Sequence, residues 1–238
     1  MTSSRVITFL SPPEPCEYLR DRTSQLQYEF VSQITTAEYM SRLKAGWRRF
    51  GYTIFRPQCP SCRMCQSLRV PVATFRPDRS QRRAWTANHQ SVLLEIGTPS
   101  RSDAKEALRE AFQRYQHEDK AWPLETADYD EMFVENPFHT EEWCYYLGDR
   151  LIAVGYVDRL PEGLSAIYFY YDPAERHRSL GTFNVLAVIA AARERHLPHV
   201  YLGYYVEGCR SLEYKARFRP NEVLSSSGAW VPFSTSQS

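Results

Sequence analysis

The sequence predicts an α+β protein, with a mixed sheet and helices in the C-terminal part and a smaller cysteine-containing α/β region at the N-terminus. Of its 238 residues 43% are hydrophobic and 24% are charged, ordinary values that exclude wholesale disorder. Strand-like runs and runs with helical spacing both occur in each half. Three cysteines within seven residues mark the N-terminal half. The length fits one large domain or two small ones, and we expect a division into 1–100 and 101–238.

The N-terminal region is expected to be a small mixed unit. Thr35 or Thr36 is suited to cap a helix over 37–49, in which Tyr39, Leu43 and neighbouring apolar residues share one face. Further strands are expected at 52–55, 68–72 and 91–96, and a helix at 103–117.

The C-terminal part has clearer signals. Strands are expected at 143–147, 151–158 and 165–172, joined by short turns. Ser179 is a suitable N-cap for a helix that ends near residue 196, with Pro198 as its stop, and a strand at 199–206 follows. A three-strand meander, a helix and one more strand is the order typical of the acyltransferase fold of the N-acetyltransferase type.

Charge is strongly segregated although the net charge is only +1. Residues 42–83 hold eleven basic side chains against one acid, and residues 103–162 hold fifteen acids against six bases. Such blocks favour a nucleic-acid partner, with an internal contact between the two segments or a general richness in arginine as alternatives. The longest uncharged apolar stretch, 179–192, is shorter than the ~20 residues of a spanning helix. The N-terminus also lacks a signal core, so we expect a cytoplasmic protein with no membrane partner.

The cysteines have the spacing of metal ligands. Cys59, Cys62 and Cys65, together with Cys16, predict a four-thiolate site for zinc or an iron–sulfur cluster. Buried reduced thiols or a redox-sensing role remain alternatives, and disulfides are not expected.

The start of the C-terminal helix is a candidate anion site. Arg178, Ser179 and Gly181 lie where a strand gives way to a helix N-terminus, although an ordinary capped core helix is the alternative. Phe183 is expected to obstruct the pyrophosphate of an acyl-CoA. Farther on, the aromatic tract 201–206 leads to the basic residues Lys215, Arg217 and Arg219, which suit nucleic acid.

Nine sequence blocks, spread over nearly the whole chain, form a joint pattern: 16–19, 55–59 with Cys62 and Cys65, 69–72, 75–83, 158–166, 171–173, 178–182, 201–204 and 214–220. Together these blocks resemble the bacterial aspartate/glutamate leucyltransferases, relatives of the arginyl-tRNA–protein transferases. The sequence departs from that pattern at Tyr205, at Ser211-Leu212 and over 116–124.

The resemblance implies transfer of leucine from leucyl-tRNA to a protein that begins with Asp or Glu, which marks that protein for degradation. Such aminolysis of an activated ester requires no cofactor. Tyr204 and Lys215 are the catalytic candidates, with the Tyr204 hydroxyl or a backbone amide polarising the ester. Arg79, Arg82 and Arg83 are the candidates for binding the tRNA, and Arg178, Lys215 and Arg217 those for the acceptor carboxylate or the tRNA 3′ end. Gln81, Ser179 and Gly181 are further candidate substrate-binding residues. The alternatives are an arginyl-tRNA–protein transferase, an acyl-CoA N-acetyltransferase and a non-enzymatic RNA-binding module.

Overall fold

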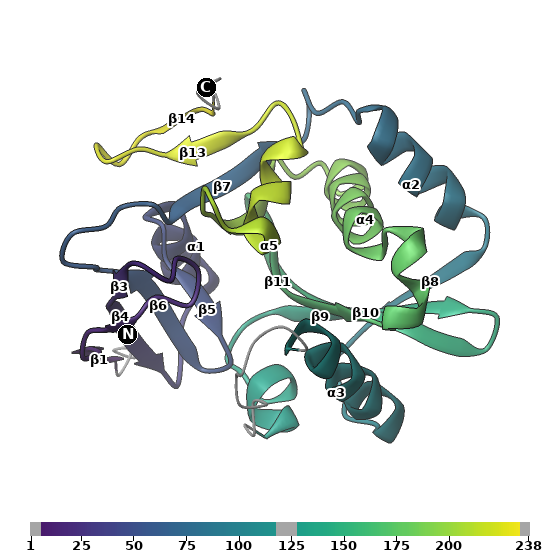
Figure 1. The fold of residues 1–238 in the computed structure, drawn as a ribbon, viewed down its shortest axis with the longest axis horizontal. Helices are drawn as coiled ribbons and strands as arrows, with labels where there is room; N and C mark the ends of the chain where they lie inside the picture. Colours follow the sequence, from purple (N-terminus) through teal and green to yellow (C-terminus); the bar gives the residue numbers. More distant parts are fainter. Residues whose placement is uncertain (1–5, 118–127, 234–238) are drawn as a thin grey trace.

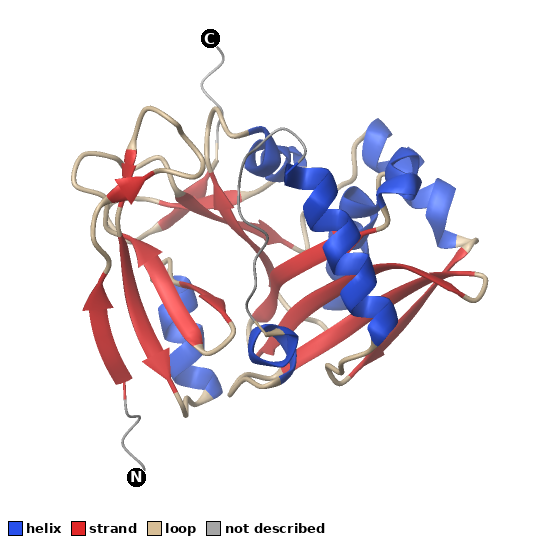
Figure 2. Cartoon of the chain, turned by 60° about the horizontal axis from the view of Figure 1, so that its bottom comes forward, coloured by secondary structure: helices blue, strands red, loops and turns tan. Residues whose placement is uncertain are grey.

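The structure is a computed structural model that describes residues 6–117 and 128–233. It contains a small and a large sheet side by side (Figures 1 and 2). The small sheet has the order β1-β4-β6-β5, with bounds Val6–Leu10, Leu26–Val31, Thr53–Pro57 and Arg48–Phe50. A two-stranded ribbon, β2 (Glu14–Pro15) with β3 (Thr23–Ser24), accompanies it.

Helix α1 (Thr36–Lys44) packs on the small sheet and begins where the sequence predicts. Thr35 and Glu38 form a reciprocal capping box, which satisfies two backbone N–H groups that the first turn leaves free. The helix ends five residues before the predicted boundary because Gly46 adopts φ +86° and the chain then enters β5. Arg48 and Arg49 are therefore strand residues, whose side chains point to opposite faces.

The large sheet has eight strands in the order β14-β13-β7-β12-β11-β10-β9-β8. Strands β9, β10 and β11 form an antiparallel meander, and β12 lies parallel to β11, as the predicted element order requires. In sequence order the bounds are β7 Gln66–Pro71, β8 Val92–Gly97, β9 Thr140–Leu147, β10 Arg150–Leu160, β11 Gly163–Tyr171, β12 His199–Tyr205, β13 Glu222–Leu224 and β14 Trp230–Pro232.

Helices cover both faces of the large sheet (Figure 1). Helix α4 (Leu180–Glu194) packs on one face with α2 (Arg79–His89) outside it, and α3 (Asp103–His117) packs on the other. Short elements complete the chain: η1 (Asp130–Val134), η2 (Pro173–Arg178), α5 (Arg210–Glu213) and η3 (Tyr214–Arg217). The predicted α+β class with a mixed sheet is confirmed. None of the described helices is long and apolar enough to cross a membrane.

Among the residues that the structure describes, two ion pairs join the basic and acidic segments. Arg49 and Asp158 form a buried pair, each 1% exposed, and Lys44 binds Glu162 at 2.6 Å near the surface. For these four residues, the predicted alternative of an internal contact between the basic and acidic segments is confirmed. Strands β7 and β8 precede residue 100 and yet belong to the large sheet, while the domain boundary at that residue stays a prediction.

Candidate functional site

The large sheet opens between β11 and β12. These parallel strands pair only from Gly163 to Ser165 and from His199 to Tyr201, and each continues beyond that point without its neighbour. A cavity of about 500 Å³, here called the wedge cavity, lies at the opening and is bordered by α4, α5 and η3. Backbone groups that the diverging strands no longer exchange are available there to a bound molecule.

The walls of the wedge cavity are mixed, with apolar side chains beside hydroxyl, amide and basic ones. Leu202, Val185 and Phe169 contribute to one side, and Arg176 and Lys215 are its cations. None of the described residues that line it is Asp or Glu. The cavity therefore suits an uncharged apolar group next to an anionic or carbonyl-bearing one.

Lys215 lines this cavity, and its surroundings lower its pKa. Its Nζ donates to the Tyr204 carbonyl at 3.1 Å. Burial, and then the charge of Arg48, lower the pKa of Lys215 to about 7, because both disfavour the ammonium form. A lysine with such a pKa exchanges protons at neutral pH, as a general base requires.

The predicted tRNA-binding arginines share the outer face of α2. Arg79, Arg82 and Arg83 are exposed and line one shallow surface depression. Gln81, predicted with them, is instead 3% exposed: its side chain accepts from the Asp78 N–H and donates to the Arg217 carbonyl. Helical spacing turns Gln81 inward, so its role is to cap α2 and tie it to η3.

Short helix η3 connects this basic face to the wedge cavity. Arg217 is exposed beside the start of α2, whereas Lys215, two residues earlier, lines the cavity. The sequence grouped these two basic residues, and the structure assigns them to different surroundings.

Arg178 does not reach the wedge cavity. It donates to Glu175 at 2.8 Å and to the Ala87 carbonyl at 3.4 Å, so it ties η2 to the end of α2. Arg176, which the sequence also places at this anion site, is the arginine of the turn that lines the cavity. The turn conformation decides which of the two faces the opening.

The helix start at Ser179 differs from the expected cap. Ser179 adopts the left-handed conformation with φ +56°, and its hydroxyl caps nothing, although it and Gly181 line the cavity. Phe183 is 4% exposed and packs against Trp85 and Tyr145 in the core. The expectation that Phe183 obstructs the site was therefore wrong, because its side chain points away from the opening.

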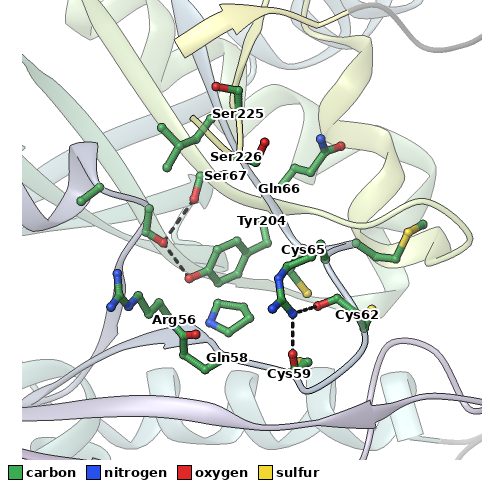
Figure 3. Close-up of a pocket in the computed structure, with 16 residues that line it drawn as sticks. Arg56, Gln58, Cys59, Cys62, Cys65, Gln66, Ser67, Tyr204, Ser225 and Ser226 are labelled. Carbon is green, nitrogen blue, oxygen red and sulfur yellow. Dashed lines mark hydrogen bonds between the residues drawn. The ribbon is translucent and has the colours of Figure 1, made fainter. Parts of the chain in front are cut away.

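Tyr204 also lies outside the wedge cavity. Its hydroxyl donates to the Gly46 carbonyl at 2.9 Å, and its ring lines a second cavity of about 520 Å³ (Figure 3). Tyr204 contributes to the Lys215 site through its backbone carbonyl alone. The expectation that its hydroxyl polarises an ester at the wedge cavity is not supported by this geometry.

The four predicted metal ligands do converge on one cavity. Cys16, Cys59, Cys62 and Cys65 all line a pocket of about 350 Å³ under the β2–β3 ribbon, and the last three also line the cavity of Figure 3. All six cysteines are unpaired. Within residues 6–117 and 128–233, no three His, Cys, Asp or Glu side chains are close enough together to hold an ion as placed. A metal at this cavity therefore stays a prediction.

Two further polar groups near the site carry no local sequence signal. Asn184 lines the wedge cavity, and its Oδ1 accepts from the Tyr145 hydroxyl at 2.7 Å. Arg48, 6% exposed, donates to the Gly203 carbonyl at 3.2 Å, next to the carbonyl that Lys215 binds. The only sequence feature that points to a functional role for Arg48 is its place in the basic segment 42–83.

A sheet that opens onto a cavity beside a lysine of lowered pKa is compatible with a group-transfer enzyme. Comparison with known proteins specifies which one. The chain belongs to the arginine-tRNA–protein transferase family: the model of the family's N terminus matches residues 14–83 and that of its C terminus matches residues 104–225. It is an aminoacyl-tRNA–protein transferase.

The relatives lie in one branch of that family. An aspartate/glutamate leucyltransferase of Campylobacter jejuni is 35% identical over 222 residues, 92% of this chain and 92% of that protein. One of Nitrosococcus oceani is 37% identical over 221 residues, 90% of this chain and 91% of that protein.

Among solved structures, the C-terminal DUF2156 domain assigned to a lysylphosphatidylglycerol synthetase of Agrobacterium fabrum is similar in fold. The TM-score is 0.50 and the identity 11%, over 69% of this chain and 61% of that one.

Proposed function

We propose that this enzyme transfers leucine from leucyl-tRNA to the N-terminal Asp or Glu of acceptor proteins, which marks them for degradation. The observation that carries the choice of donor is the lining of the wedge cavity, where apolar side chains and two cations occur with no carboxylate among the described lining residues. A leucyl side chain is bound there by burial. An arginyl side chain would bring a guanidinium toward Arg176 and Lys215 with no counter-charge.

The reaction needs positioning and one proton acceptor. The α-amine of the acceptor attacks the ester carbonyl, a C–N bond forms, and the bond to the tRNA 3′ oxygen breaks. Lys215 takes the proton from the amine and returns it to the leaving oxygen, for which a pKa of about 7 is suited. Alignment of amine and ester supplies much of the rate, since effective molarities reach ~10⁵–10⁸ M.

The tRNA is proposed to lie along α2. Arg79, Arg82 and Arg83 present three exposed guanidinium groups on one helix face, which suits phosphates. Because η3 leads from that face to the wedge cavity, a tRNA held on α2 has its 3′ end directed toward Lys215.

The large sheet is proposed to be of the N-acetyltransferase type. The meander β9–β10–β11, the helix α4 and the parallel strand β12 support this, as does the opening between β11 and β12. The unpaired state of all six cysteines supports a reducing compartment such as the cytoplasm.

Aminolysis of an activated ester needs no cofactor. Zinc or an iron–sulfur cluster at Cys16, Cys59, Cys62 and Cys65 remains a prediction for elemental analysis of the purified protein.

The test is a transfer assay with leucyl-tRNA and arginyl-tRNA charged separately, and with peptides that begin with Asp, Glu or Asn. Leucine is expected on the Asp and Glu peptides. Transfer of arginine instead would identify an arginyl transferase, and label from acetyl-CoA an N-acetyltransferase. Binding of tRNA with no transfer to any peptide would leave only the RNA-binding module.

A further inference from the structure

Arg48 is buried with two donors unused. It is 6% exposed, and one of its terminal nitrogens donates to the Gly203 carbonyl at 3.2 Å. The other two guanidinium nitrogens, Nε and Nη1, have no hydrogen-bond partner and no contact with solvent. An unpaired buried donor destabilises the fold, and a charged one does so more strongly, so this arrangement points to a ligand.

Among the described residues no carboxylate pairs with Arg48, whose guanidinium lies over the Tyr204 ring, 5.7 Å from its centroid. The groups that act on it are the hydroxyls of Tyr204, Tyr39 and Tyr201 and the ammonium of Lys215, and burial lowers its pKa. The buried carboxylate of Asp158 belongs to Arg49, which donates to both of its oxygens. Tyr39 and Thr140 also donate to Asp158, so that carboxylate has no capacity left for a second arginine.

Arg48, from β5, and Lys215, from η3, are two cations that bind backbone carbonyls of β12. Arg48 donates to the Gly203 carbonyl and Lys215 to the Tyr204 carbonyl. The two anchors are consecutive residues, whose Cα atoms are ~3.8 Å apart. The same strand contributes Leu202 to the wedge cavity and Tyr204 to the cavity of Figure 3, so both cations bind a strand that borders each cavity.

We propose that Arg48 is the residue that recognises the acidic side chain of the acceptor's N-terminal residue. The inference rests on the proposed function and deepens it. The carboxylate of Asp or Glu takes the free donors of Arg48, and the α-amine of the same residue faces Lys215. In Asp and Glu the amine and the carboxylate are a few bonds apart, which matches anchors on adjacent residues. The side chains around Arg48 must shift for the carboxylate to reach it, and that contact then closes the site.

This arrangement explains why an acid is preferred over its amide. An Asn side chain has no charge to match Arg48, and its NH₂ group places donors against donors. Charge-assisted hydrogen bonds are worth about 1.5–3 kcal/mol, which corresponds to a preference of about 10- to 150-fold.

The test is the ratio of kcat/KM for an Asp-initiated peptide to that for the matching Asn-initiated peptide, measured with leucyl-tRNA. In Arg48→Gln the ratio is expected to fall by about 10- to 150-fold, with transfer to the Asn peptide retained. Arg48→Lys keeps the charge but not the forked donors, and we expect an intermediate ratio. Calorimetric titration of the Asp peptide, without donor tRNA, should lose affinity in the same order.

Arg42→Gln is the matched control. Arg42, on α1, binds Glu29 at 2.6 Å and lines neither cavity. The ratio of kcat/KM for the Asp peptide to that for the Asn peptide should therefore stay at the wild-type value. Thermal unfolding of each variant reports folding, and if Arg48→Gln does not fold, Arg48→Lys decides. A folded Arg48 variant with the wild-type ratio would overturn the assignment, as would a wild-type enzyme that does not prefer Asp. Wild-type protein that transfers leucine to no peptide would instead overturn the proposed function.

Discussion

Arg49 donates to both carboxylate oxygens of Asp158, from Nε to Oδ2 at 2.6 Å and from a terminal nitrogen to Oδ1. The contact joins β5 of the small sheet to β10 of the large one. Because successive strand residues face opposite ways, anchoring Arg49 also directs Arg48 toward Gly203. A structural ion pair therefore positions the neighbouring residue that we assign to acceptor recognition.

Asp158→Asn is expected to destabilise the fold strongly. Breaking a buried pair leaves Arg49 uncompensated and costs about 3–5 kcal/mol, which lowers the Tm by about 6–20 °C in a chain of this size. Lys44→Ala removes the ion pair between Lys44 and Glu162, whose side chains are 40% and 49% exposed. This loss should lower the free energy of unfolding by under ~1 kcal/mol. Urea and thermal unfolding compare the two. Equally small losses of stability in the two variants would show that the buried pair between Arg49 and Asp158 does not stabilise the fold more than the exposed one.

Gly203→Ala is expected to impair turnover more than stability. Gly203 has φ +86°, and a Cβ there would lie 3.2 Å from the Lys215 Nζ, which must then move. Gly228→Ala is the control, since φ is +82° there and nothing lies within 4 Å. Both variants incur the left-handed strain of about 1–2 kcal/mol. Only Gly203→Ala should lose kcat, by roughly 10- to 100-fold, and similar kcat values in the two would refute this placement of Lys215.

The rate should depend on the neutral form of Lys215. With a pKa of about 7, Lys215 is protonated at lower pH, so kcat at saturating acceptor should rise with pH through about 7 and then level off. Lys215→Arg stays charged and should lose both that inflection and about 10²–10⁴ in rate. Arg210→Ala, exposed on α5, is the control. A pH profile unchanged in Lys215→Arg would exclude the lysine as base.

The lowered pKa of Lys215 also predicts how the stability of the fold depends on pH. The pKa of Lys215 is lowered in the folded state from 10.5 to about 7, so between those values the unfolded chain binds more protons than the folded one. This contribution destabilises the fold fully below about pH 7 and disappears as the pH rises toward 10.5. Lys215→Met should therefore be more stable than wild type at pH 7, with a difference that shrinks by about pH 10. A stability difference between Lys215→Met and wild type that stays constant across that pH range would contradict this prediction.

The α2 arginines should control tRNA affinity and its salt dependence. Alanine at Arg79, Arg82 or Arg83 removes one exposed cation each, and for every phosphate that is no longer neutralised the slope of log K against log salt should decrease by about 0.7–0.9. The KM for the peptide should not change. Arg114→Ala on α3 also removes an exposed arginine and should leave the slope intact. If it reduces the slope as much as the α2 variants do, the charge on α2 has no special role.

The sequence by itself determined α1, α3, α4 and the strands β6 to β12 in their order, whereas it predicted neither α2 nor the strands β1, β4, β5, β13 and β14. The Thr35–Glu38 capping box, the helical spacing over Asp103–His117 and the strand–turn–strand pattern from β9 to β11 are local signals, and each element formed near its predicted place. It also indicated Lys215 and the α2 arginines, because basic residues gathered beside aromatic ones stand out in a sequence.

Only the tertiary structure decided which residues meet. Arg48 reaches a carbonyl 155 residues away, and no local pattern encodes so long a contact. Orientation was equally beyond the sequence: Gln81 turns inward while its neighbours face solvent, Phe183 enters the core, and Tyr204 points away from Lys215. The physical reason is that spacing defines a face of an element, whereas packing against distant elements decides what that face touches.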